Sequence, residues 1–338
     1  MTPPVARQEP HELRTHGEVR QDPYYWMRDD EREDPEILAH LAAENSYAEH
    51  ELAPLQAFRE TLFNEIVARI PQDDATVPYR KNGYWYYVRY EEGREYPIYC
   101  RKADGEDWES GEEAIVLDVN TLAEGHEYFG IGGLSLARNA ETLAYGEDTL
   151  SRRIYTLRFR NLTTGEVLPD VIEGTTGSSV WAADNQTVFY VKREEGTLRA
   201  YQVWRHQLGD TGGDTLVFEE TDDEFSVGVG LSRSEEYVII GSRQTTTNEY
   251  RYIDASSPTD AATVLLARQE GHEYSADHAR GRFYIRTNWE ARDFRLMSTT
   301  PAQSQDRTQW REEIPARDDV HLRGFELFED HLVLTERH

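Results

Sequence analysis

The sequence has one cysteine, three methionines and no apolar run near the ~18 residues that a membrane span needs. Cys100 has no partner for an internal disulfide, which suits a reducing compartment, and we expect it to be a small packing residue in a strand. Residues 1–7 contain no apolar core, so we do not expect them to act as a secretion signal. The chain is therefore expected to be soluble and cytoplasmic, with no membrane partner.

Basic residues are scarce relative to acidic ones. The 36 Lys and Arg face 64 Asp and Glu, which gives a formal net charge of −28. A surface of this charge repels nucleic-acid phosphates and anionic membranes, so neither is an expected partner. Solubility and attraction of basic substrates both explain the acidity, and the sequence leaves the two explanations open.

The turn that presents a catalytic serine is also missing. Such a turn needs Gly-x-Ser-x-Gly, because the sharp strand-to-helix bend tolerates only small neighbours. The nearest match, Gly133-Leu134-Ser135-Leu136-Ala137, is followed by a polar turn and not by a helical pattern. Ser135 is therefore expected to be a strand residue, and we predict no catalytic residue in this chain.

Metal and cofactor motifs are lacking as well. His11 and His16 are five residues apart and would not share one helical face, as a zinc protease helix requires. The acidic runs 29–31 and 222–224 lack the glycine and the spacing of a calcium loop. No glycine-rich loop that cradles phosphate occurs, so we expect neither a metal nor a cofactor.

Residues 1–72 contain two apolar stripes at helical spacing. Asp34-Pro35-Glu36 predicts a helix start, with Asp34 as N-cap and Pro35 at the first helical position. The stripes are interrupted by Pro54 and ended by Pro71, and they consist of Ile37, Leu38, Leu41, Ala48 and Leu52, then Leu55, Phe58, Leu62, Ile66 and Ile70. Each apolar face must pack on something, and a helical cap on the rest of the chain is one interpretation.

Residues 73–338 consist of short apolar or alternating runs separated by turn residues, which predicts strands. Apolar runs recur at intervals of about 44 to 59 residues and end at Tyr86, Tyr145, Tyr190, Ile240, Tyr284 and Leu334. A period of ~40–50 residues with four strands per unit is typical of a β-propeller, whereas an extended β-sandwich would not keep it. We count five complete blades and a sixth that begins at 324–328.

The segment from His16 to Asp30 contains the run Tyr24-Tyr25-Trp26-Met27-Arg28-Asp29-Asp30. It resembles the N-terminal signature of the prolyl oligopeptidase family, and its form looks most like the oligopeptidase B branch. The resemblance implies a mainly β chain, with a helical segment 1–72 that packs on an α/β-hydrolase domain and a seven-bladed propeller over 73–338. The propeller is then truncated in its sixth blade, and the hydrolase domain with its Ser/Asp/His triad lies beyond His338.

The loop from Gly146 to Arg153 resembles the Glu-Asp-x-x-Ser-Arg-Arg stretch of that branch. Glu127 holds a similar position between strands one blade earlier. In the family one face of the propeller covers the active site, so Glu127, Arg152 and Arg153 are candidates for interdomain salt bridges. An ordinary solvated loop is the alternative.

The function that the resemblance implies is that of a serine oligopeptidase that cleaves short basic peptides after Arg or Lys. This chain then acts as size filter and lid, and its partners are those peptides and the missing hydrolase domain. Three alternatives remain: a post-proline cleaving member of the family, a stand-alone propeller that binds proteins, and a five-bladed glycosidase. The last would need inward-facing carboxylate pairs.

Overall fold

The computed structural model describes residues 1–105, 108–109 and 111–338 and divides the chain into two compact units, Met1–Gln72 and Asp73–His338. The first unit contains both helices that the apolar stripes predict, although the second ends before Ala68 and not at Pro71. A hairpin that the sequence did not indicate precedes them. The elements are β1 (Glu12–Thr15), β2 (Glu18–Gln21), η1 (Tyr25–Met27), α1 (Pro35–Leu52), η2 (Ala53–Leu55) and α2 (Gln56–Val67). No helix among the described residues is long and apolar enough to cross a membrane.

Helix α1 begins where Asp34 caps it. The Asp34 Oδ1 accepts hydrogen bonds from the backbone N–H groups of Glu36 at 2.8 Å and Ile37 at 3.3 Å. Asp29, from the signature segment, accepts the N–H groups of Glu33 at 2.7 Å and Asp34 at 2.8 Å. The two carboxylates therefore satisfy amides that would otherwise lack partners at the helix start.

The aromatic residues of the signature segment hold the N-terminal segment that precedes β1. Trp26 donates its indole N–H to the carbonyl of Arg7 at 3.0 Å, and the Arg7 guanidinium lies 4.4 Å from the centre of that ring. Tyr25 stacks on His11, with ring centres 3.9 Å apart. The Tyr-Tyr-Trp run thus has a local structural role, independent of any contact with another domain.

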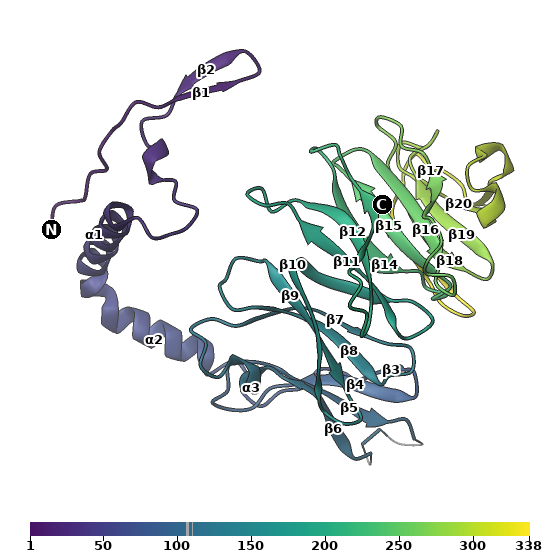
Figure 1. Cartoon of the computed structure of the whole chain (residues 1–338), viewed down its shortest axis with the longest axis horizontal. Coiled ribbons are helices and arrows are strands. Elements are labelled where there is room, and N and C mark those ends of the chain that lie inside the picture. Colours follow the sequence, from purple (N-terminus) through teal and green to yellow (C-terminus); the bar gives the residue numbers. More distant parts are fainter. Residues whose placement is uncertain (106–107, 110) are drawn as a thin grey trace. The chain divides into compact units, whose positions relative to one another are not determined.

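The second unit is a propeller arc whose sheets follow one another in sequence order (Figure 1). Blade 1 contains β3 (Tyr79–Lys81), β4 (Tyr84–Arg89), β5 (Ile98–Ala103) and β6 (Glu113–Asp118), and α3 (Val119–Ala123) follows it. Blade 2 contains β7 (Gly130–Leu136), β8 (Thr142–Asp148), β9 (Tyr155–Asn161) and the first half of β10 (Val167–Trp181). Blade 3 contains the second half of β10, β11 (Thr187–Arg193), β12 (Ala200–Gln207) and β13 (Thr215–Glu219).

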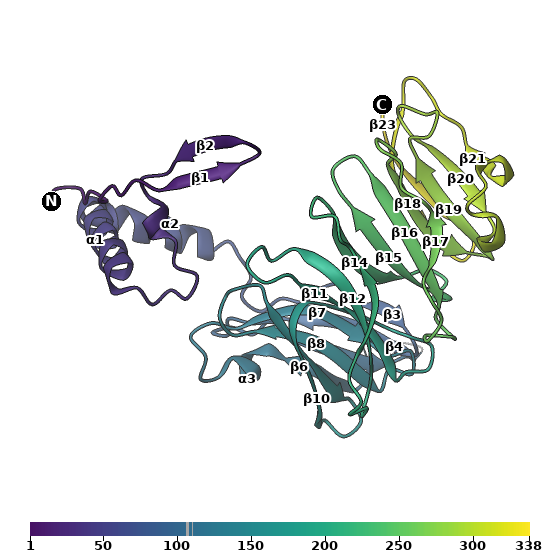
Figure 2. The ribbon, with the colours of Figure 1, turned by 45° about the horizontal axis from the view of Figure 1, so that its top comes forward.

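The remaining sheets continue the same antiparallel order (Figure 2). Blade 4 contains β14 (Ser226–Leu231), β15 (Tyr237–Arg243), β16 (Asn248–Asp254) and β17 (Thr263–Leu266). Blade 5 contains β18 (Tyr274–Ala279), β19 (Arg282–Thr287), β20 (Arg295–Thr299) and β21 (Arg311–Ile314), with 3-10 turns η3 (Pro301–Gln303) and η4 (Arg307–Gln309). Blade 6 contains β22 (His321–Leu327) and β23 (Leu332–Arg337). Five four-stranded blades and the start of a sixth confirm the sequence prediction.

The long strand β10 serves two blades, so blades 2 and 3 form one continuous seven-stranded sheet. Its first half pairs with β9 and its second half with β11, and the register shifts between Ile172 and Ser179. Gly174 and Gly177 lie within that shift with φ of +75° and +84°, a backbone conformation that favours glycine. They let the strand bend from one blade into the next without breaking.

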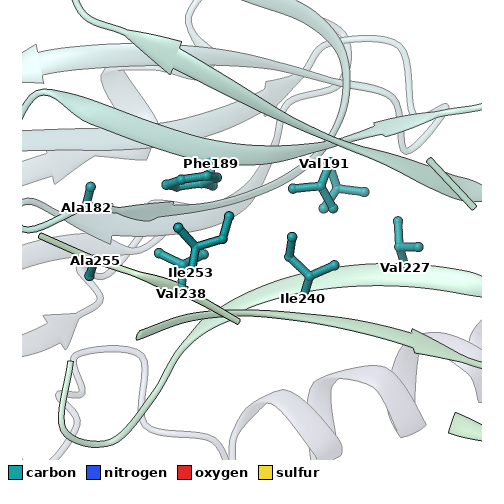
Figure 3. Close-up of a cluster of buried hydrophobic side chains, with 9 residues drawn as sticks. Ala182, Phe189, Val191, Val227, Val238, Ile240, Ile253 and Ala255 are labelled. Atoms are coloured by element: carbon teal, nitrogen blue, oxygen red, sulfur yellow. The ribbon is translucent and has the colours of Figure 1, made fainter. Parts of the chain in front are cut away.

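Hydrophobic cores lie between successive blades. Phe189 and Val191 of β11 pack against Val238 and Ile240 of β15, and all four are at most 1% exposed (Figure 3). The six apolar runs found in the sequence all fall in second strands: β4, β8, β11, β15, β19 and β23. In blades 2 to 5 the second strand lies between two neighbouring blades and is covered on both faces, whereas β4 and β23 lie in the first and last blades of the arc and are covered on one face by a neighbouring blade. The repeat of apolar runs in the sequence therefore corresponds to the second strands of successive blades.

Candidate functional site on the loop face of the propeller

The strands of each blade alternate in direction, which separates two ends of the propeller. The start of β7 at Gly130 pairs with the end of β8 at Asp148, so both lie at one end. We name this end the loop face, and it carries the connections after second strands (90–97, 149–154, 194–199, 244–247, 288–294) and between blades (119–129, 220–225, 267–273, 315–320). Ala75 bridges to Arg89 at the end of β4, so the chain also enters blade 1 here. The opposite end, the turn face, carries the hairpin turns between first and second strands.

All three residues predicted to make interdomain contacts lie on the loop face. Glu127 is exposed in the link between blades 1 and 2, while Arg152 and Arg153 belong to the loop between β8 and β9. The buried Asp148 shapes that loop by accepting the N–H groups of Leu150 at 2.9 Å and Arg153 at 2.7 Å. Within the described part of the chain, the side chains of Glu127, Arg152 and Arg153 make no ion pair, and no contact joins them to one another.

A groove of about 870 Å³ lies between the loops of blades 2 and 3. Arg152 lines it together with Glu173 and Glu195. Neither carboxylate has a hydrogen-bond or ion-pair partner among residues 1–105, 108–109 and 111–338. The groove therefore offers unpaired charges of both signs to another surface.

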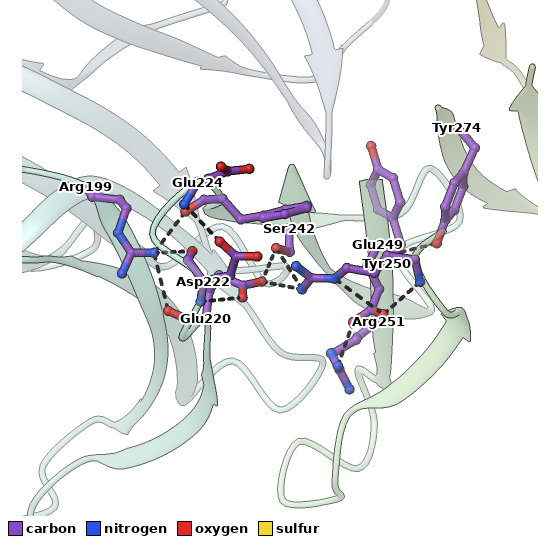
Figure 4. Close-up of polar contacts among 11 residues, drawn as sticks. Arg199, Glu220, Asp222, Glu224, Ser242, Glu249, Tyr250, Arg251 and Tyr274 are labelled. Atoms are coloured by element: carbon purple, nitrogen blue, oxygen red, sulfur yellow. Dashed lines mark hydrogen bonds and ion pairs between the residues drawn. The ribbon is translucent and has the colours of Figure 1, made fainter. Parts of the chain in front are cut away.

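A buried ion-pair network joins blades 3 and 4 on the same face, and the sequence did not reveal it (Figure 4). Glu220 is 4% exposed and is bound by the Arg268 guanidinium and the Ser242 hydroxyl, while its other oxygen accepts the N–H of Asp222 at 3.1 Å. Arg268 also lies 4.0 Å from the centre of the Phe225 ring. Burial alone would raise the pKa of Glu220, but these partners outweigh it and hold the pKa below its ordinary value.

Arg199 fixes the link between blades 3 and 4. Its Nη1 donates to the carbonyls of Glu220, Asp222 and Phe225 at 3.3, 3.0 and 2.9 Å (Figure 4). Its Nε lies 3.4 Å from the carboxylate of Glu194, at the other end of the same loop. The acidic run 222–224 is thus tied to the scaffold through the backbone of Asp222. Spacing along the chain gives no signal for such a contact.

The turn face is narrowed by contacts between blades that are not neighbours. Glu235, in the first turn of blade 4, is paired with Lys81 of blade 1 at 3.0 Å. Arg138 of blade 2 donates to the carbonyl of the same residue, and its Nε lies 3.7 Å from the carboxylate. Three first turns therefore converge on one residue, which constricts this end of the channel.

The described residues contain no arrangement that performs covalent catalysis at an accessible position. Ser135 lies inside β7, and its carbonyl accepts the indole N–H of Trp181 at 2.9 Å, which confirms it as a blade residue. One serine–histidine contact exists, with Ser234 Oγ 2.8 Å from His278 Nδ1, but His278 is fully buried. Burial lowers the pKa of His278, and the Ser234 hydroxyl also accepts the N–H of Glu236. This pair stabilises the turn, and its imidazole does not face solvent.

Metal binding and thiol chemistry have no structural support in the described residues either. No group of three or more His, Cys, Asp or Glu among them is placed to hold a metal ion. Cys100 is 1% exposed between Tyr87 and Ile98, which confirms its packing role. Burial, with the nearby Glu113, raises the pKa of its thiol to about 11.

The family model for the prolyl oligopeptidase N-terminal β-propeller domain matches residues 3–338. The chain is 42% identical over 351 residues to dipeptidyl aminopeptidase BI of Pseudoxanthomonas mexicana, covering 99% of this chain and 48% of the relative. It is 34% identical to Protease 2 of Moraxella lacunata over 87% of the chain and 43% of that protein.

Solved structures agree with these relatives. Oligopeptidase B from Leishmania major superposes with a TM-score of 0.92 and 28% identity, covering 99% of this chain and 49% of that one. Oligopeptidase B from Trypanosoma brucei superposes with a TM-score of 0.90 and 30% identity over the same shares. The chain spans about half the length of the relatives it matches. It belongs to the prolyl oligopeptidase family, of which it is the N-terminal β-propeller part.

Proposed function

We propose that the chain is the substrate-selecting half of a serine oligopeptidase that cleaves short basic peptides after Arg or Lys. The observation that carries the proposal is the match of almost the whole chain to oligopeptidase B at 28–30% identity. The net charge of −28 adds to it, because an acidic surface attracts cationic peptides over the ~8–10 Å allowed by salt screening. A cytoplasmic location belongs to the same proposal, since the single buried cysteine forms no internal disulfide.

The constricted turn face supports a role as size filter. Lys81, Arg138 and Glu235 close part of that end, so a peptide has more room at the loop face. The chain also enters the propeller from the loop face. In the proposal this face is turned toward the hydrolase domain and serves as its lid.

The first unit supports a docking role for residues 1–72. Only Ile37 is buried in α1, and no residue is buried in α2. Phe58 and Phe63 are each 66% exposed, and further exposed apolar side chains are Leu38, Leu41, Leu52, Leu55, Leu62, Ile66 and Ile70. Two helices with so much apolar surface are not stable in water alone. The proposed cover is the hydrolase domain of the full-length protein.

Specificity is tested on the full-length protein with matched peptides that carry Arg, Lys or Pro before the scissile bond. We expect cleavage after Arg and Lys, and peptides of up to about thirty residues are expected to be cut while folded proteins are spared. Preferential cleavage after Pro would replace the Arg/Lys assignment by the post-proline alternative. Absence of any peptide cleavage would favour a stand-alone binding propeller.

Removal of N-terminal dipeptides is the second candidate, because identity to dipeptidyl aminopeptidase BI, at 42%, exceeds that to Protease 2. The two activities differ in their need for a free N-terminus. Acetylation of the peptide leaves an endopeptidase active and stops a dipeptidyl aminopeptidase. The same peptides, acetylated and free, therefore distinguish the candidates.

Alanine substitution of Arg152 and Arg153 tests the proposed interdomain contact in the full-length protein. Exposed ion pairs contribute about 0.2–1 kcal/mol each, so we expect kcat/KM to change by about two- to five-fold and to lose part of its salt dependence. The melting temperature should stay within a few degrees. Arg323, exposed in β22, is the matched control for removing one charge. Identical kinetics in both single variants and in the double variant would remove these residues from the contact, and Glu127→Gln is tested in the same way.

A further inference from the structure

A hollow of about 370 Å³ lies where the first strands of blades 4, 5 and 6 approach one another. Its rim is formed by residues 228–231 of β14, residues 275–277 of β18 and Phe325 of β22. Because the first strands of three blades share it, the hollow opens toward the channel. Its volume is at the lower end of the ~300–1,000 Å³ typical of ligand pockets.

Two glycines create this hollow, and the fold requires neither. Gly228 and Gly230 have no positive φ, so other residues can adopt their backbone conformation. A Cβ added at Gly230 meets nothing within 4 Å, and one at Gly228 meets only the end of the Arg243 side chain at 3.6 Å. Glycine also weakens a strand relative to residues with a side chain. The two glycines therefore cost stability and keep space open.

The wall behind the glycines is apolar and aromatic. Ile239 of β15 pairs with Gly230, and Tyr250 of β16 stands beside Gly241, where an added Cβ would lie 3.1 Å from its ring. Both side chains line the hollow and pack against the core between blades 4 and 5. The Tyr250 backbone is held by the hydroxyl of Tyr274 at 2.9 Å, so the ring is carried by a fixed scaffold (Figure 4). An apolar side chain placed above Gly230 would contact this wall.

A single cation lies at the loop-face end of the hollow. Arg243 ends β15, pairs with Ser226 in the sheet, and places Nη2 next to Gly228. Within the described part of the chain its guanidinium has no hydrogen bond or ion pair, whereas Arg251 and Arg268 nearby are both paired with carboxylates. An unpaired guanidinium in so acidic a chain is available to bind a carboxylate.

We propose that this hollow binds the C-terminal residue of a peptide, with an aromatic or branched aliphatic side chain above Gly228 and Gly230 and the terminal carboxylate on Arg243. In a C-terminal residue the free carboxylate and the side chain are attached to the same Cα. Such a residue therefore presents an apolar group and a negative charge close together. The proposal rests on the proposed peptidase function for its biological meaning. It makes the propeller wall a specificity subsite for the end of the peptide that leaves after cleavage.

The test is calorimetric titration of the full-length protein with acetyl-Gly-Gly-Phe, its C-terminal amide, and acetyl-Gly-Gly-Gly. We expect the first peptide to bind about ten-fold more tightly than either of the others. Gly230→Leu fills the hollow, and Arg243→Gln removes the charge, so each should weaken binding of acetyl-Gly-Gly-Phe about ten-fold. Gly230→Ala adds one methyl group in open space and should bind more tightly than Gly230→Leu. The melting temperature of both Gly230 variants should equal or exceed that of the unchanged protein.

Equal binding of the three peptides, or equal affinity in the unchanged protein and the folded Gly230→Leu variant, overturns the proposal. An arginyl amide has no amino-acid residue after the scissile bond, so it has no part that could bind in the hollow. Its cleavage therefore tests the proposed peptidase function separately. Its kcat/KM should be the same in all variants. If the unchanged protein does not cleave it, the peptidase proposal fails while the binding result still decides the subsite.

Discussion

Replacement of Glu220 by alanine is expected to lower the free energy of unfolding by about 3 kcal/mol or more. The carboxylate is 4% exposed and holds Arg268 and Ser242 across the junction of blades 3 and 4. Removing one partner of a buried pair leaves the other charge without compensation, which costs ~3–5 kcal/mol, and the partial exposure of Arg268 places this case near the lower limit. Denaturant unfolding of the full-length protein measures the loss.

The neighbouring Glu219 is the matched control, because it is exposed and, among the residues that the structure describes, its side chain accepts one hydrogen bond, from Gln202 at 3.2 Å. Its alanine variant should differ from the unchanged protein by less than about 0.5 kcal/mol. The contribution of Glu220 also depends on pH. Its pKa is lowered in the folded state, so the stability it adds is present above the ordinary pKa of ~4.3 and is lost as the pH falls through the lowered value. A stability gap between the unchanged protein and Glu220→Gln that does not narrow below about pH 4 would contradict this role.

Replacement of Gly146 by alanine is expected to destabilise the junction of blades 2 and 3 by about 3 kcal/mol or to prevent folding. A Cβ at this position would lie 2.5 Å from the carbonyl oxygen of Gly132 and 2.7 Å from the Cα of Gly177. Both atoms belong to the backbone of neighbouring strands, so no side-chain rotation relieves the clash. The strands must move apart, and the cores on either side lose contacts.

Gly230→Ala is the control for this prediction, since its Cβ would meet nothing within 4 Å. The free energy of unfolding should be unchanged or slightly higher, because alanine loses less backbone conformational entropy on folding than glycine does. Thermal unfolding of the two variants side by side separates close approach from a general effect of losing glycine. Equal melting temperatures for Gly146→Ala and Gly230→Ala would show that the strands are not held as closely as the structure indicates.

The elements that the sequence predicted well are those whose signal is local. Asp34 and Pro35 mark the start of α1 because an N-cap and an N1 proline act within one helical turn. The apolar runs at Tyr145 and Ile240 mark second strands, because these strands are covered on both faces by neighbouring blades. The β1–β2 hairpin was missed, since its short polar strands carry no apolar alternation.

The candidate site was predicted only in part. Successive strands of a blade run in opposite directions, so the order of the strands shows which loops lie on the loop face. The shared location of Glu127, Arg152 and Arg153 could therefore be predicted once the strands had been assigned to blades. The pairing of Glu220 with Arg268 was not, because the partners are 48 residues apart and look like ordinary surface charges in the sequence. Burial turns such a pair into a structural contact, and burial is a property of the packed blades.

The fold class, the number of blades and the family could all be predicted from the sequence, because they depend on periodic apolar runs and on one contiguous signature at residues 16–30. The packed blades were needed to show which charges are paired, that Lys81 and Arg138 converge on Glu235, and that Gly228 and Gly230 leave a hollow. A glycine or a charged residue has the same local conformational preference wherever it lies in the chain. What it does depends on the atoms that distant strands bring within a few ångströms of it.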